Sequence, residues 1–91
     1  MNDADSKLSA YRKDINEIDD KLVKLFIKRM ETAGKIGALN KEAGLPDLNV
    51  NREEEVKKCL TKDVPEIYKE SVNKLYDALF AISREHQESL K

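Results

Sequence analysis

The chain has 91 residues, which is enough for one domain but leaves little apolar volume for a private hydrophobic core. Charged residues make up 38% of the chain and aromatic residues 5%, with no Trp, a balance typical of long amphipathic helices rather than strands. Seventeen basic and eighteen acidic side chains give a net charge of −1, which argues against nucleic acid or a membrane surface as a partner.

The first predicted element is one long helix from Ser6 to about Ala43. The first seven residues, MNDADSK, contain no apolar run, so we expect no signal peptide or membrane span and a cytoplasmic protein. Gly44 and Pro46 supply the stop, and LPDLNVN forms the connecting loop. One face of the helix follows spacings of three and four, at Leu8, Tyr11, Ile15, Ile18, Leu22, Leu25, Arg29, Thr32, Ile36 and Leu39, and all but Arg29 and Thr32 are apolar.

A short second helix is predicted after this loop. Asn51 with Glu54 three residues later resembles a capping box, so the helix should begin there and run through Val56 and Leu60. Cys59 is the only cysteine, which excludes a disulfide within the chain, and we expect it to be a small buried hydrophobe.

Pro65 suits the first turn of a third helix that runs toward the C-terminus. His86, the only histidine, leaves no zinc site of ordinary composition, and we expect a partly buried structural role for it. The apolar stripe of this helix is Tyr68, Val72, Leu75, Leu79, Ile82 and His86.

The length of the first helix predicts the quaternary structure. About 37 residues at roughly 1.5 Å each span on the order of 55 Å, whereas a compact monomer of this size has a radius of gyration of about 12 Å. An overhanging apolar stripe would be unstable in water, so the simplest partner is a second copy. We therefore expect an all-α fold with one very long, one short and one medium-long helix, forming a single domain over residues 1–91 in an intertwined homodimer.

A positive charge interrupts the stripe of the first helix. Arg29 falls where the spacing calls for an apolar residue, and a buried guanidinium without an anion would cost several kcal/mol. The anion is either an acidic side chain of another helix or a bound carboxylate. Arg12, near the other end of the helix, and Arg52, at the start of the second helix, are further candidates for anion binding, although either residue alone is more often a surface residue.

The runs YRKDINEIDDKLVKLFIKRMETAGKIG, LPDLNVNREEEV and ISREHQ resemble the AroQ-type chorismate mutases, over nearly the whole chain. The resemblance implies two chains that interlock through their long first helices, with each active site lined by both. It implies that Arg12 binds one substrate carboxylate in the partner's site and Arg29 binds the other within its own chain. Arg52 would support the carboxylate site, and Glu53 would hold the ring hydroxyl of the substrate.

The same resemblance gives roles to two polar residues of the third helix. Gln87 would donate a hydrogen bond to the ether oxygen of the substrate, and Ser83 would contact a carboxylate. They lie four residues apart, so both can point into one cavity. Without the resemblance, both would be read as ordinary polar residues on a solvated face.

Two positions depart from the family pattern. Asn40 stands where the family has a lysine that pairs with the glutamine at the ether oxygen, and loss of such a donor typically costs about 10²–10³ in rate. Lys41, the next residue, could replace that lysine if the helix unwound or bulged by one residue. Asn49 stands where the family often has an aspartate near the substrate hydroxyl, and Asn can still donate and accept a hydrogen bond.

Gly34 and Gly37 lie inside the first predicted helix, where each costs about 1 kcal/mol relative to Ala. Close approach of a ligand and close approach of a crossing helix are both open explanations.

The function implied by the resemblance is conversion of chorismate to prephenate in phenylalanine and tyrosine biosynthesis. This is an intramolecular rearrangement, so cations and hydrogen-bond donors suffice and no metal or cofactor is expected. Two alternatives stay open: an enzyme like the isochorismate-pyruvate lyases, and a non-catalytic helical dimer that binds ligands like chorismate.

Overall fold

The computed structural model describes residues 2–90, which form three α-helices and no strand. They are α1 (Asp3–Ala43), α2 (Val50–Thr61) and α3 (Glu66–Ser89). The predicted all-α fold and its order of long, short and medium-long helices are confirmed. No helix in the described chain combines the length and apolar content that a membrane crossing needs. The chain divides after Glu31 into two compact units, which are described separately.

Residues 2–31 consist of the N-terminal part of α1 and Asn2, which precedes it. The helix begins earlier than expected because Asn2 caps it: the backbone N–H of Asp5 donates to Asn2 Oδ1 at 2.8 Å, and acidic residues in the first turn favour the helix dipole. No residue of this stretch is buried, and only Phe26, Arg29 and Met30 are half-buried. The predicted apolar stripe is exposed in the single chain at Leu8, Tyr11, Ile15, Ile18, Leu22 and Leu25.

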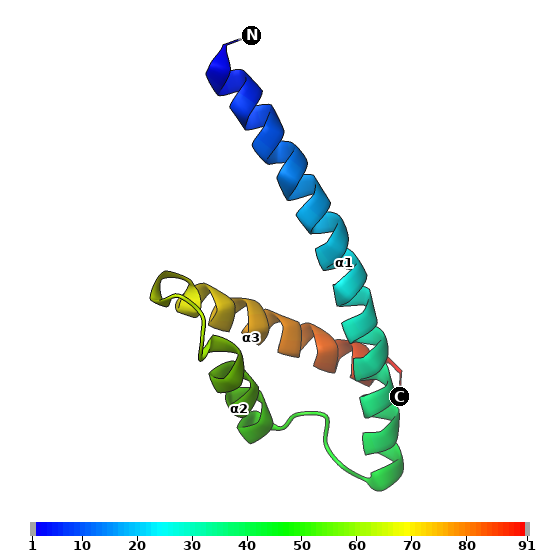
Figure 1. Cartoon of the computed structure of the whole chain (residues 1–91). Coiled ribbons are helices and arrows are strands. Elements are labelled where there is room, and N and C mark those ends of the chain that lie inside the picture. The colour runs from blue at the N-terminus through cyan, green and yellow to red at the C-terminus, as the bar shows by residue number, and fades with distance from the viewer. Residues whose placement is uncertain (1, 91) are drawn as a thin grey trace. The chain divides into compact units, whose positions relative to one another are not determined.

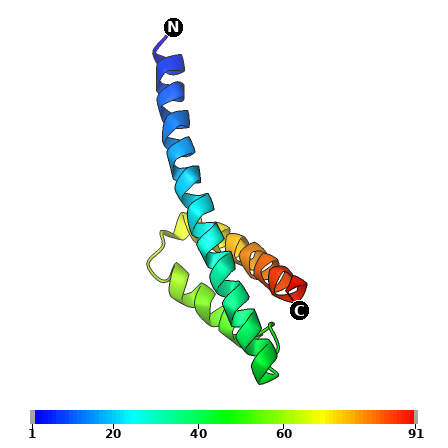
Figure 2. The same ribbon diagram turned by 90° about the vertical axis from the view of Figure 1, so that its right-hand side faces the viewer.

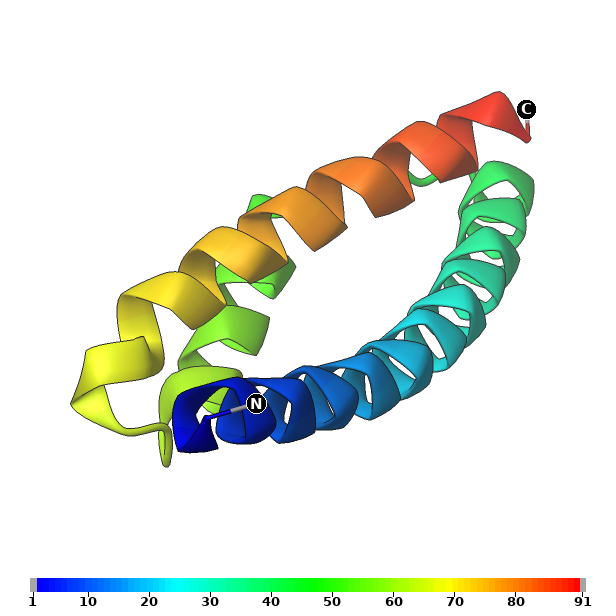
Figure 3. The ribbon, with the colours of Figure 1, turned by 90° about the horizontal axis from the view of Figure 1, so that it is seen from above.

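In the second unit, α2 and α3 form an antiparallel helical hairpin. They are joined by the turn at residues 62–65, from which both helices extend (Figures 1 and 2). Two ion pairs are consistent only with antiparallel helices. Lys57 binds Asp77, while Glu53, which is earlier in α2, binds Arg84, which is later in α3. Viewed from above, α2 runs beside α3 (Figure 3).

The small core of the second unit lies where the C-terminal turns of α3 meet residues 33–37 of α1. The red end of α3 reaches this part of α1 in Figure 1. Phe80 is also buried in this unit and packs edge-to-face on Tyr76 of the same helix, with ring centroids 5.8 Å apart. The other buried residues of the unit are Ala33, Gly37, Ser83 and Gln87.

The buried face of α3 differs from the predicted stripe. Tyr68, Leu75 and Ile82 are exposed, and the buried positions are Phe80, Ser83 and Gln87. Val72, Leu79 and His86 of the predicted stripe are half-buried, as expected for part of a packed face. The stripe missed the most buried positions because two of the three are polar and an apolar pattern does not include them. Cys59, expected to be buried, is exposed on α2, since this short helix has no buried residue.

Candidate active site

The acid predicted to hold a hydroxyl, Glu53, lies in the first turn of α2 and is bound by Arg84 of α3. Nη1 of Arg84 donates to Oε2 of Glu53 in a charge-assisted hydrogen bond. The side chains are 22% (Glu53) and 31% (Arg84) exposed, so the pair is shielded from water on most sides. Sequence reasoning missed Arg84. Two facts together could have indicated it: an acid that is partly buried on α2 needs a positive partner, and Arg84 is the only arginine of α3.

The two polar residues predicted on α3, Ser83 and Gln87, are both 7% exposed. Their reading as ordinary residues on a solvated face is therefore wrong. Ser83 Oγ donates to the carbonyl of Leu79 at 2.8 Å, and Gln87 Nε2 donates to the carbonyl of Ala33 in α1 at 2.9 Å. Because a carbonyl only accepts, this contact fixes which end of the Gln87 amide faces α1.

Gly37 explains how Gln87 comes so close to the backbone of α1. A Cβ added at Gly37 would lie 2.9 Å from Cγ, 3.1 Å from Cβ and 3.5 Å from Cα of Gln87. A Cβ added at Gly34 would meet the end of Leu90 at 3.2 Å and His86 at 3.5 Å. Of the two explanations left open by the sequence, the crossing helix is the one that the structure supports at both glycines.

The helix α1 is regular around Asn40 and up to its C-terminus at Ala43. The N–H of Leu45 bonds the carbonyl of Asn40 at 2.7 Å, and the N–H of Gly44 bonds that of Lys41 at 3.3 Å. Gly44 has a φ of 69°, which completes a Schellman motif at the C-terminus of α1. The unwinding or bulge that would turn Lys41 inward is absent from this stretch, and Lys41 is exposed.

The side chain of Asn40 is half-buried and points to the loop that follows α1. Its Nδ2 donates to Oδ1 of Asp47 at 3.2 Å, so it ties the end of α1 to this loop. The amide at this position therefore has a structural partner. It provides donors but no full positive charge.

Asn49, rather than Asn51, caps α2. The backbone N–H of Arg52 donates to Asn49 Oδ1 at 3.0 Å, and Asn51 already lies within the first turn. The predicted capping box on Asn51 was therefore wrong, because the N-cap of the helix lies two residues earlier than the pattern indicated. The Arg52 side chain is 67% exposed, with Nη1 4.0 Å from Glu55, so it is held only weakly and can reorient toward an anion.

The remaining two predicted residues lie in the first unit. Arg12 is exposed and Arg29 is half-buried on α1. Within the second unit, by contrast, the fold brings Glu53 together with Arg84, and it buries Ser83 and Gln87 on the same helix as Arg84. The chemistry these residues offer is recognition of anions and hydroxyls by guanidinium groups, one carboxylate and amide donors.

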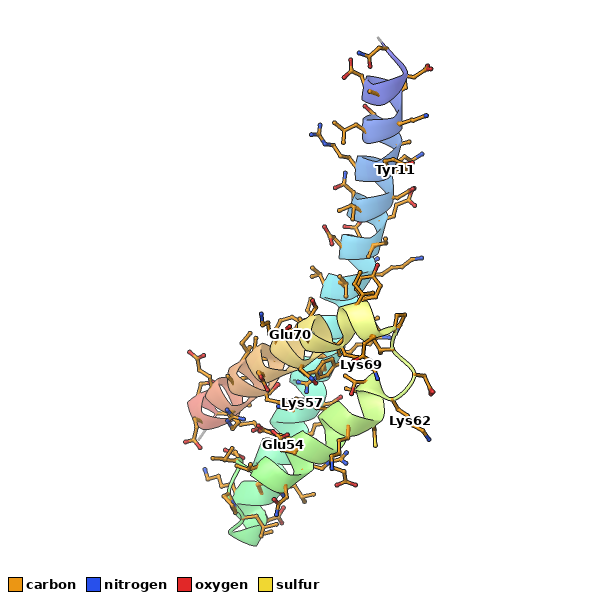
Figure 4. The ribbon with its side chains drawn as sticks, turned by 90° about the vertical axis from the view of Figure 1, so that its left-hand side faces the viewer. Tyr11, Glu54, Lys57, Lys62, Lys69 and Glu70 are labelled. Carbon is orange, nitrogen blue, oxygen red and sulfur yellow. The ribbon has the colours of Figure 1, made fainter. Side chains whose placement is uncertain are left out.

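No group of three or more His, Cys, Asp or Glu side chains in residues 2–90 is arranged to hold a metal ion. Outside the candidate site, a second charge cluster joins α2 to α3. Lys57 Nζ lies 2.8 Å from Asp77 Oδ1 and 2.9 Å from Glu54 Oε1, and Figure 4 shows Lys57 and Glu54 on α2. The hydrogen bond to Asp77, and then that to Glu54, raises the pKa of Lys57 above its ordinary value of 10.5.

Comparison with known proteins gives one family. The family model for chorismate mutase type II matches residues 11–88, which contain every candidate site residue named above. Comparison with curated proteins and with solved structures gives no match.

Proposed function

The chain belongs to the chorismate mutase type II family, and from this we propose that it converts chorismate to prephenate in the biosynthesis of phenylalanine and tyrosine. The observation that carries the proposal is that the family match spans both units and includes Arg12, Arg29, Glu53 and Gln87. The reaction breaks one carbon–oxygen bond and forms one carbon–carbon bond within the same molecule. It needs no nucleophile, oxidant or external proton.

In the proposed site, guanidinium groups bind the two substrate carboxylates. Arg29 binds one and Arg12 the other, with Arg52 and Ser83 supporting them. Cations that bind both carboxylates hold the substrate in its folded reactive shape, which lowers the entropic part of the barrier. The half-burial of Arg29 supports this role, since a shielded guanidinium binds a carboxylate more strongly than an exposed one does.

Gln87 is proposed to stabilise the charge that develops on the ether oxygen as the carbon–oxygen bond breaks. A primary amide has two N–H groups, and the bond to Ala33 uses one of them. The second remains for the substrate, and the first keeps the amide oriented before the substrate arrives. Preorganised donors are the main source of such stabilisation. At the ring end, Glu53 accepts a hydrogen bond from the substrate hydroxyl, and Asn49 lies four residues earlier, at the N-cap of α2.

We propose that the active unit is an intertwined homodimer in which residues 1–91 act as one functional domain. In residues 2–31 the apolar stripe is exposed, and nothing in this stretch is buried. Apolar side chains repeated at helical spacing in water favour association with a matching surface, and a second copy of the chain supplies one. Arg12 would then enter the site of the partner subunit.

The direct test is turnover. Purified protein incubated with chorismate should yield prephenate, and incubated with isochorismate it should yield neither pyruvate nor salicylate. Pyruvate and salicylate would identify a lyase instead. Absence of turnover together with retained binding of chorismate would identify a binding protein, the candidate favoured by the neutral, hydrogen-bonded side chain of Asn40. Absence of both turnover and binding would refute the proposal.

Shared active sites have a sharper test in mixed dimers. Arg12→Ala and Arg29→Ala homodimers should both be nearly inactive. Co-expression in equal amounts makes half of the dimers mixed, and each mixed dimer has one site with both arginines intact, so about a quarter of wild-type activity should return. No recovery, with mixed dimers shown to form, would contradict the placement of Arg12 in the partner's site.

A further inference from the structure

We propose that Arg84 is a positioning residue that holds Glu53 in place for the substrate hydroxyl. The inference deepens the proposed function and rests on it. It concerns a residue with no role in the resemblance from which the other site residues were assigned.

The geometry singles out this ion pair. Arg84 follows buried Ser83 directly and precedes buried Gln87 by three residues on α3, and its guanidinium crosses to the first turn of α2. Glu53 is thereby attached to the helix that carries two other proposed substrate contacts. A free glutamate side chain samples several rotamers, and a charge-assisted hydrogen bond selects one of them.

Charge gives a second reason for the pair. The proposed substrate carries two carboxylates, and an uncompensated Glu53 carboxylate in the same partly buried site would repel it. Arg84 neutralises that charge through Oε2 of Glu53. A carboxylate accepts several hydrogen bonds, so Oε1 remains able to accept one from a hydroxyl. Arg84 therefore lets an acid serve as an acceptor next to a dianion.

The alternative is that Arg84 only fastens α2 to α3. The chain offers a matched control for this, because Lys57 and Asp77 join the same two helices farther along the hairpin, at 2.8 Å. Asp77 is 62% exposed and belongs to no part of the proposed site. If fastening alone matters, loss of either pair should have the same kind of effect.

The experiment is a double-mutant cycle on the full-length protein, with kcat and KM for chorismate measured separately. The variants are R84Q, E53Q and R84Q/E53Q, with R84K as the conservative variant and D77N as the control. We expect R84Q to lower kcat/KM by on the order of 10-fold, mainly through KM, and R84K to recover part of it, whereas D77N leaves both constants unchanged. In the E53Q background, R84Q should change kcat/KM by less than about 2-fold, because the group it positions is already altered.

Two results would overturn the inference. One is an equal loss from R84Q with and without the E53Q change, and the other is a loss from D77N as large as that from R84Q. Thermal melts of all variants identify any that do not fold; if R84Q does not, R84K is carried through the same cycle. Wild-type turnover of chorismate separates failure of this inference from failure of the proposed function. If the wild type binds chorismate without turnover, the cycle is run on the dissociation constant.

Discussion

Residues 2–31 and residues 32–90 are both helical, but they differ in what their side chains contact. The second unit buries Phe80, Ser83 and Gln87, contacts α1 through Gln87 and joins α2 to α3 by ion pairs. The first unit buries none of its residues, although its apolar stripe is just as regular. Helical periodicity therefore predicts an apolar surface, but it does not predict whether the fold of the same chain covers that surface.

The largest effect is expected from a charge placed on the apolar stripe of the first unit. Leu22→Lys should abolish the proposed dimer and lower turnover by about 10³-fold, because a buried unpaired ammonium is costly and the partner's Arg12 is lost from each site. Sedimentation and turnover measure the two effects. Ala10→Lys adds the same charge on another face of α1 and should change neither. A dimeric, active Leu22→Lys variant would contradict the dimer proposed here.

The second largest effect is expected at the end of α1. Asn40→Lys should raise kcat by up to about 10²-fold, since it supplies the full positive charge that the ether oxygen lacks. Its ammonium can also replace the hydrogen bond to Asp47 by an ion pair, so the loop should stay in place. Lys41→Ala is the matched control and should leave turnover unchanged, because Lys41 is exposed on a regular helix. A fall in activity for Lys41→Ala would return the role to that residue.

Gly37→Ala tests the packing of the second unit. The added Cβ would meet Gln87 at 2.9 Å and could be accommodated only by moving α3, so overpacking should cost about 1–3 kcal/mol, offset by roughly 1 kcal/mol of helix propensity. The melting temperature should fall by several degrees at fixed protein concentration. Gly34→Ala meets a flexible Leu90 side chain and should be close to neutral. Equal melting temperatures for both variants would contradict the tight contact at Gly37.

The smallest effect is expected at the ion pairs of Lys57, which join α2 to α3 outside the candidate site. The pKa of Lys57 is raised by Asp77 and Glu54, so its contribution to stability is present below the ordinary value of 10.5 and is lost as the pH rises through the higher value of the folded protein. Lys57→Gln should therefore lower the melting temperature slightly near pH 7, and the difference should vanish at strongly alkaline pH. A difference that persists unchanged at alkaline pH would mean that the lost methylene packing, not the charge, is responsible.

The sequence predicted the helices well because their signals are local. Apolar spacing, Gly44 and Pro65 each act within a few residues, and the helix boundaries follow from them to within three residues. The burial of Ser83 and Gln87 and the pairing of Glu53 with Arg84 depend on contacts between helices, which no local pattern records. Asn51 shows the remaining limit: two asparagines lie two residues apart, and only the backbone decides which one caps α2.

The hydrogen bond from Gln87 to Ala33 also fixes the position of α3 along its own axis against residues 33–37 of α1. The acceptor is a main-chain carbonyl, so sliding α3 lengthwise by one residue moves the donor by about 1.5 Å and breaks the contact. The same shift moves Gln87 away from Gly37, whose missing side chain leaves the space that Gln87 fills, and brings a different side chain to that space. Insertions or deletions that displace α3 therefore lose the contacts of Gln87 with Ala33 and Gly37 together. Substitutions on the exposed surface of α3 leave its position unchanged.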